Sequence, residues 1–102
     1  MSPQIISEYD DVYTDNYVSA NVSVLTSQVE AKAGGSRLSN REFVIIHNLG
    51  PQTVYYGPSG VTSTSGDPLY MGERIGLPIG GAIAVYLVTA VSTANVRVQE
   101  LA

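Results

Sequence analysis

Short segments in which apolar and polar residues alternate constrain the fold of this chain most. Residues 18–24, VSANVSV, place every apolar residue on one face of an extended strand and every polar residue on the other. Residues 28–33 and 94–101 alternate in the same way, and 43–48 and 81–92 are apolar runs with strand-like composition. No segment shows a convincing helical period, so the sequence predicts an all-β protein.

Glycines and prolines punctuate residues 48–73, NLGPQTVYYGPSGVTSTSGDPLYMGE. Glycine supplies positive φ, and proline fixes φ and removes a hydrogen-bond donor, so both residues mark turns and strand edges. A phosphate-binding loop would need a lysine and a following helix, and this stretch offers neither. We interpret it as turns between short strands at 52–57, 60–64, 68–71 and 73–77.

About eight strands with turn signals every eight to twelve residues or so are typical of a small antiparallel β-sandwich or a jelly-roll-like barrel. We expect a hairpin over 43–57, closed at LGP, and a second over 81–101, closed at TAN. The 102 residues suffice for one domain. We assign residues 18–102 to the β-sandwich and residues 1–17 to an extended N-terminal arm.

The expected arm carries tyrosines at every fourth position, namely Tyr9, Tyr13 and Tyr17. That spacing suits one face of a helix, but the intervening Asp, Val, Thr and Asn residues are poor helix formers, which favours an extended segment. Two readings stay open: a frayed terminus, or an arm that lays its tyrosines onto a neighbouring subunit.

The net charge of −4 is unevenly distributed. Four acids (Glu8, Asp10, Asp11 and Asp15) precede residue 21 without any Lys or Arg, whereas five acids and five bases balance in residues 21–102. A nucleic-acid partner is not expected, because it requires a basic surface. No apolar run reaches membrane-spanning length and no signal peptide is evident, so we expect no membrane partner and synthesis in the cytoplasm without secretion.

Candidates for chemistry are few. The chain has no cysteine, and its one histidine, His47, ends an apolar run, where a packing role is expected. No serine lies in a nucleophile-elbow motif, and the spacing of Asp10, Asp11 and Asp15 lacks the glycine and glutamate of a calcium loop. We therefore expect no enzyme, no catalytic residue, no metal and no cofactor.

Tyrosine and arginine are among the residue types enriched at protein–protein interfaces, so they are the candidate partner-binding residues of this chain. Adjacent Tyr55 and Tyr56 must point to opposite sides of a strand, and the outward ring could cover the core, meet a partner or stack on a sugar. Arg41, Arg74 and Arg97 lie near Glu42, Glu73 and Glu100, respectively, in the sequence. This proximity suggests surface ion pairs, or contacts with acids of a neighbouring subunit. The expected contact residues are Tyr9, Tyr13, Tyr17, Arg41, Tyr55, Tyr56, Arg74 and Arg97.

Residues 40–102 carry a recognisable order of turns and strands. Arg41 precedes an apolar strand ending in Asn48-Leu49-Gly50, and the order continues with Val54-Tyr55-Tyr56-Gly57, Val61-Thr62, Ser65-Gly66, Pro68-Leu69, Gly72-Glu73, Tyr86 and Val96 to Glu100. This part of the chain resembles the small β-sandwich capsid decoration (cement) proteins of tailed bacteriophages. The pattern consists of turns and strands, brings no catalytic residue with it, and does not include the acidic arm.

The resemblance implies a virion structural protein on the outer surface of the capsid. Such a protein binds the mature lattice of the major capsid protein and stabilises it, often as a homotrimer. Related sandwiches occur in tails and head fibres. The alternative is therefore a tail, head-fibre or baseplate module that recognises a host-surface carbohydrate.

Overall fold

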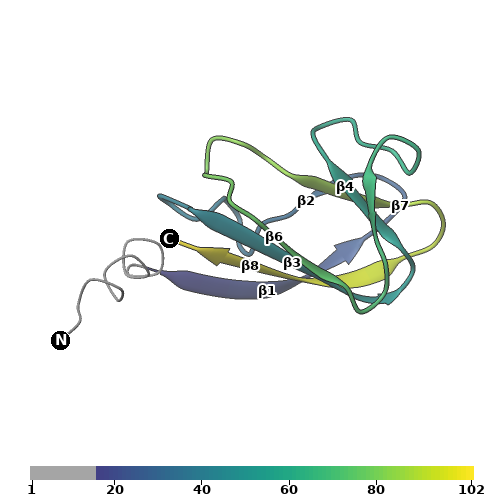
Figure 1. Ribbon diagram of the computed structural model, residues 1–102, viewed down its shortest axis with the longest axis horizontal. Coiled ribbons are helices and arrows are strands. Elements are labelled where there is room, and N and C mark those ends of the chain that lie inside the picture. The colour runs from purple at the N-terminus through teal and green to yellow at the C-terminus, as the bar shows by residue number, and fades with distance from the viewer. Residues whose placement is uncertain (1–15) are drawn as a thin grey trace.

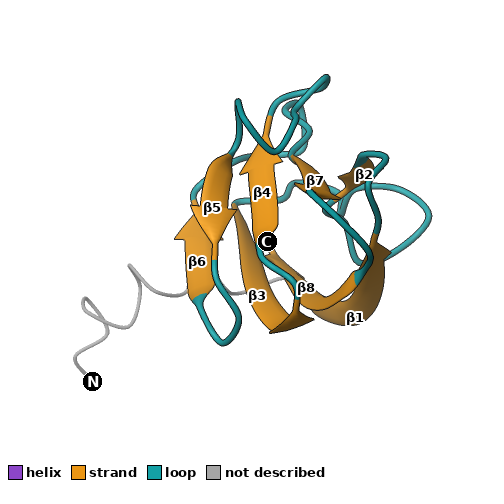
Figure 2. Ribbon diagram, turned by 90° about the vertical axis from the view of Figure 1, so that its right-hand side faces the viewer, coloured by secondary structure: helices purple, strands orange, loops and turns teal. Residues whose placement is uncertain are grey.

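The computed structural model describes residues 16–102, which form two antiparallel four-stranded sheets packed as a β-sandwich (Figure 1). Sheet A has the strand order β1-β8-β3-β6, and sheet B has the order β2-β7-β4-β5 (Figure 2). The all-β prediction is confirmed for these residues. The strands are β1 (Tyr17–Val24), β2 (Val29–Glu30), β3 (Phe43–Pro51), β4 (Val54–Gly57), β5 (Asp67–Leu69), β6 (Arg74–Leu77), β7 (Tyr86–Thr89) and β8 (Ala94–Leu101).

The strand pairs are nested. β1 pairs with β8, β2 with β7, β3 with β6 and β4 with β5, while β3–β8 and β4–β7 contacts join the pairs into sheets. Only β4 and β5 are consecutive strands that pair; every other connection crosses from one sheet to the other.

The two expected hairpins are therefore wrong. Both edges of β3 are occupied by β6 and β8, so β4 cannot pair with it. Both edges of β7 are likewise occupied, by β2 and β4, so β8 lies in the other sheet. Stacked sheets lie about 10 Å apart, a gap that a connection of a few residues spans as easily as it closes a hairpin. Local alternation does not distinguish the two outcomes.

Several expected strands are shorter than the sequence suggested. Residues 60–64 form turns, with amides of Val61, Ser65 and Gly66 bonded to carbonyls three or four residues back. Residues 81–92 are strand only in β7, because the segment before it is held by side-chain bonds from Arg41. The pieces expected at 68–71 and 73–77 are confirmed as the edge strands β5 and β6.

The core lies between the sheets and is made from the inward side of each strand. In β3, Val44, Ile46 and Asn48 are fully buried and their neighbours are more exposed, as alternation predicts. Each fully buried aliphatic side chain contributes about 1.5–3 kcal/mol relative to an exposed one. The buried cluster comprises Val24, Ala31, Val44, Ile46, Val54, Leu69, Val85, Leu87, Ala94, Val96 and Val98.

Asn48 is a fully buried polar residue that joins the two sheets. Its Nδ2 donates to the carbonyls of Gln52 (2.9 Å) and Leu69 (2.8 Å), and its Oδ1 accepts from the Gly50 amide (2.8 Å). A register shift between Asn48 and Gly50 forms a bulge, and Gly50 has a φ of 89°. A Cβ at Gly50 would also collide with the side chain of Met71. Asn48 and Gly50 thus fix the point at which β3 leaves sheet A.

Candidate partner-binding surfaces

Residues 16–102 contain no group of three His, Asp or Glu side chains that could hold a metal ion. The aspartates weighed as calcium ligands (Asp10, Asp11 and Asp15) lie outside the described residues, as do Tyr9 and Tyr13. In the described part of the chain, no helix is long and apolar enough to cross a membrane.

Arg41 is not on the surface. Its side chain is fully buried, and its Nη1 donates to Glu100 Oε2 at 2.7 Å. The expected surface ion pair with Glu42 is wrong, because Arg41 ends at the inner side of the sandwich while Glu42 is exposed. Nε and Nη2 donate to three carbonyls in the segment before β7, those of Ile79, Gly80 and Ile83. A partner cannot contact this guanidinium in the folded domain.

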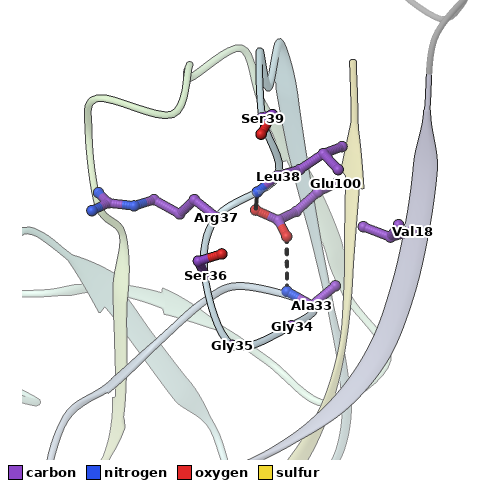
Figure 3. Close-up of a pocket in the computed structure, with 9 residues that line it drawn as sticks. All are labelled: Val18, Ala33, Gly34, Gly35, Ser36, Arg37, Leu38, Ser39 and Glu100. Carbon is purple, nitrogen blue, oxygen red and sulfur yellow. Dashed lines mark hydrogen bonds between the residues drawn. The ribbon is translucent and has the colours of Figure 1, made fainter.

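Glu100, the partner of Arg41, binds the loop that precedes β3, and the two side chains together form a buried clamp. Its Oε1 accepts from the Ala33 amide at 2.9 Å, and its Oε2 accepts from the Leu38 amide at 3.3 Å as well as from Arg41. Figure 3 shows the carboxylate turned toward the loop of residues 33–39, above a cavity of about 320 Å³. Both carboxylate oxygens are occupied, so this cavity presents no free acid for catalysis or metal binding. The clamp fixes two long connections to β8.

The outer face of sheet A carries a polar row across all four strands. The register aligns Asn21 of β1 with Arg97 of β8, His47 of β3 and Arg74 of β6. Arg97 Nε donates to Asn21 Oδ1 at 2.6 Å, and Arg74 makes no side-chain hydrogen bond or ion pair with any described residue. The expected ion pairs of these arginines with Glu73 and Glu100 are therefore wrong. The structure brings Arg74 and Arg97 together around His47, which lies inside β3 rather than at its end.

Strand β1 is an edge strand of sheet A that lacks charged residues and proline. It is eight residues long, and among residues 16–102 it pairs only with β8. Its inward residues Val18, Ala20 and Val22 are only half-buried, although Val22 packs against the core cluster. Natural edge strands are ordinarily protected by charges, prolines or short length. An unprotected edge of this length suits pairing with another chain.

The directions of the free edge amides follow from the end of β1. Asn16 and Ala102 exchange both backbone hydrogen bonds (3.1 and 2.9 Å). Because such pairs alternate along an antiparallel ladder, Val18, Ala20 and Val22 direct their amides to β8. Ser19, Asn21 and Ser23 direct theirs to the open edge.

Exposed apolar side chains gather in the loops at one end of the sandwich. Four connections meet there, on the side opposite the C-terminus in Figure 1: residues 25–28, 52–53, 70–73 and 90–93. Of the seven large hydrophobic side chains that are exposed in the described part of the chain, these loops and the adjoining bulge carry five: Leu25, Leu49, Tyr70, Met71 and Val91. Such a concentration is typical of a surface that contacts another protein.

The three described tyrosines among the expected contact residues occupy different settings. Tyr17 is the first residue of β1 rather than part of an arm, is 61% exposed, and its hydroxyl accepts from Gln99 Nε2 at 2.7 Å. Tyr56 packs against the core cluster, and Tyr55 lies on the opposite face of β4, as adjacency in a strand requires. Tyr56 also lines a groove of about 250 Å³ whose other residues are apolar. A sugar site needs polar groups beside the ring, and this groove does not supply them.

Burial raises the pKa of the Tyr56 hydroxyl above its ordinary value of 10.0, and the negative charges of Asp67 and Glu73 raise it further. The folded state therefore favours the neutral phenol. The contribution of the Tyr56 hydroxyl to stability is complete below the ordinary pKa and is lost as pH rises through the raised pKa.

Because of this pKa shift of Tyr56, we expect the free energy of unfolding to fall above about pH 10, and to fall less steeply in Tyr56→Phe. Urea unfolding across this range tests it, with Tyr70→Phe as the exposed control; equal slopes in Tyr56→Phe and the parent would contradict it.

Sequence reasoning missed Asn48 and Glu100 as key residues, although a signal was present. Val44, Ile46 and Asn48 share one phase of alternation, and Val96, Val98 and Glu100 share another. A polar residue in the inward phase of a strand must find buried partners.

Comparison with protein families, curated proteins and solved structures finds no match to this chain.

Proposed function

We propose that this chain is a structural component of a virion, a capsid decoration protein that binds the lattice of the major capsid protein. The observation that carries the proposal is the strand order, 1-8-3-6 in one sheet and 2-7-4-5 in the other. Nested pairs in two four-stranded sheets support the assignment of a jelly roll, a fold that recurs in viral capsid proteins and in lectins. Fold alone does not assign function, so the surfaces must carry the rest.

The surfaces described above support a role in contacts between chains. The uncharged β1 edge offers backbone donors and acceptors to a partner strand, and the loop end offers exposed apolar side chains. The residues that carry the resemblance, notably Arg41, Asn48 and Glu100, are buried clamps. The resemblance therefore supports the sandwich itself, while an outer-surface position on the capsid, a homotrimeric state and an extended N-terminal arm are part of the proposal.

A decoration protein acts by mass action. A ligand that binds only the mature lattice lowers the free energy of that state, and many copies act together. The test is the copy number per particle, measured by quantitative mass spectrometry of purified virions. Hundreds of copies, in simple ratio to the major capsid protein, are expected. A handful or a few dozen would move the protein to the tail or fibres, where a carbohydrate-binding role becomes the better explanation, and absence from virions would overturn the proposal.

The β1 edge gives a mutational test of the contact. Ser19→Pro removes an amide that faces the open edge and leaves the bonds of β1 to β8 intact. We expect about tenfold weaker binding to expanded capsids lacking the protein, since a net hydrogen bond is worth about 1 kcal/mol and a proline also hinders strand docking. Binding is measured by co-sedimentation. Ser19→Ala, which keeps the amide, is the matched control, and unchanged binding of Ser19→Pro would exclude β1 as the contact.

A further inference from the structure

The polar row on the outer face of sheet A has unsatisfied positive charge. Two arginines, Arg97 and Arg74, flank His47 on adjacent strands, and neither makes an ion pair with a described residue. Glu73 adjoins Arg74 in sequence, but its Oε1 accepts from the Tyr70 amide at 2.8 Å. The Asn21 contact at Arg97 Nε fixes that guanidinium and leaves its two terminal nitrogens without a partner in residues 16–102. A carboxylate can bind such a pair of nitrogens in the bidentate manner.

The charge of the chain identifies a complementary segment. The described residues hold five acids and five bases, so the sandwich is neutral, and its three ion pairs use the other three bases. The whole excess negative charge lies in residues 8–15, which contain Glu8, Asp10, Asp11 and Asp15 and no base. We propose that the row formed by Asn21, Arg97, His47 and Arg74 is the docking site for this acidic segment of the same chain. The proposal does not depend on the decoration role.

The length of the segment fits the distance. β1 begins next to Asn16, and the row crosses β1 at Asn21, five residues further along. At about 3.4 Å per residue this is about 17 Å, so a segment that turns back at Asp15 and runs over the outer face brings Asp10 and Asp11 level with Arg97. Arg74 lies two strands beyond Arg97, about 10 Å away, which is the length of the three residue steps from Asp11 to Glu8 in an extended segment. The positions of the acids thus match those of the two arginines.

The same chain is the favoured source of the segment in solution. A segment attached a few residues from its site has an effective concentration in the millimolar range, well above that of a second copy at ordinary concentrations. Exposed ion pairs are individually weak, so tethering decides which segment occupies the row.

Paramagnetic relaxation enhancement tests the proposal directly. The chain has no cysteine, so Ser7→Cys accepts a single nitroxide label beside Glu8. We expect selective broadening of the amides of His47, Arg74 and Arg97. In the Arg74→Glu/Arg97→Glu variant the docked population should fall at least about fivefold, because two weak ion pairs become repulsive. Glu8→Arg/Asp10→Arg/Asp11→Arg in that background should restore the broadening.

The control changes the same charge elsewhere. Lys32→Glu/Arg37→Glu alters two bases that pair with Glu30, away from the row, and should leave the broadening unchanged. Mixing spin-labelled protein with ¹⁵N-labelled protein that carries no nitroxide separates the source of the segment. Broadening at the row in the mixed sample, without broadening in the sample whose ¹⁵N-labelled chain carries the nitroxide itself, would show docking of a second copy's segment. Absence of broadening in both of these samples would show an empty row. Either result overturns the proposal.

Discussion

Replacing Glu100 with glutamine is expected to lower the free energy of unfolding by about 3–5 kcal/mol. The substitution keeps the side-chain shape but leaves the fully buried Arg41 guanidinium without its counter-charge. It also replaces one of the two carboxylate oxygens, which accept from the amides of Ala33 and Leu38, with an NH2 donor that would face one of these amides. The total stability of a typical domain is about 5–15 kcal/mol, so the variant should be close to unfolded at physiological temperature.

Urea unfolding followed by circular dichroism measures the effect. Glu42→Gln is the matched control, because Glu42 neighbours Arg41 in sequence but is exposed, and it should change stability by less than about 0.5 kcal/mol. If Glu100→Gln behaves like this control, the buried ion pair does not hold the fold.

The double variant Arg41→Met/Glu100→Leu separates charge from hydrogen bonding. Replacing a buried ion pair by apolar residues is often neutral or stabilising. Here it should remain destabilising, because two backbone amides and three backbone carbonyls lose the side chains that satisfy them. A double variant as stable as the parent would show that water or rearranged loops satisfy those groups.

Asn48→Ala is the second large effect, with an expected loss of about 2–4 kcal/mol of unfolding free energy. The substitution leaves two carbonyls and one amide without partners inside the sandwich, at the bulge where β3 passes toward sheet B. Asn48→Asp should be no better, because a carboxylate oxygen would then face the carbonyls of Gln52 and Leu69.

Thermal and urea unfolding test this prediction, with Asn95→Ala as the control. Asn95 is exposed and pairs with Gly50 across the same bulge. Asn95→Ala therefore changes a side chain at the bulge without removing a buried hydrogen bond. A loss below about 1 kcal/mol in Asn48→Ala would indicate that the bulge is held by its backbone alone.

Most of the strands, and the inward faces of β1 and β8, followed from the sequence, because a side-chain period of two is a local property. The expected strand at 60–64 did not form. The assignment of strands to sheets did not follow from the sequence, since a short connection serves a hairpin or a crossing equally. Pairing of Arg41 with Glu100 joins residues 59 positions apart, and sequence proximity pointed instead to Glu42. The polar row likewise depends on the register of four strands, which no single segment specifies.

The residues on which the proposed resemblance to decoration proteins rests have structural roles in this chain. Arg41 and Glu100 clamp two loops, Asn48 and Gly50 form the bulge, and the Glu73 carboxylate accepts a hydrogen bond from an amide in its own turn. Such residues define a fold and leave its surfaces free to differ. Tests of function should therefore be directed at the β1 edge, the apolar loop end and the polar row.

The position of β8 has a consequence for synthesis of the protein. Of the eight strands it leaves the ribosome last, yet it lies between β1 and β3 and forms the hydrogen-bonded ladders that join them in sheet A. β1 is made about 70 residues before its partner and must wait unpaired, since non-local pairing cannot begin until both segments exist. A ribosome that stops before residue 94 releases a chain without this central strand. Synthesis of β8 thus becomes a condition for folding, and copies that lack β8 are excluded from any assembly that requires the sandwich.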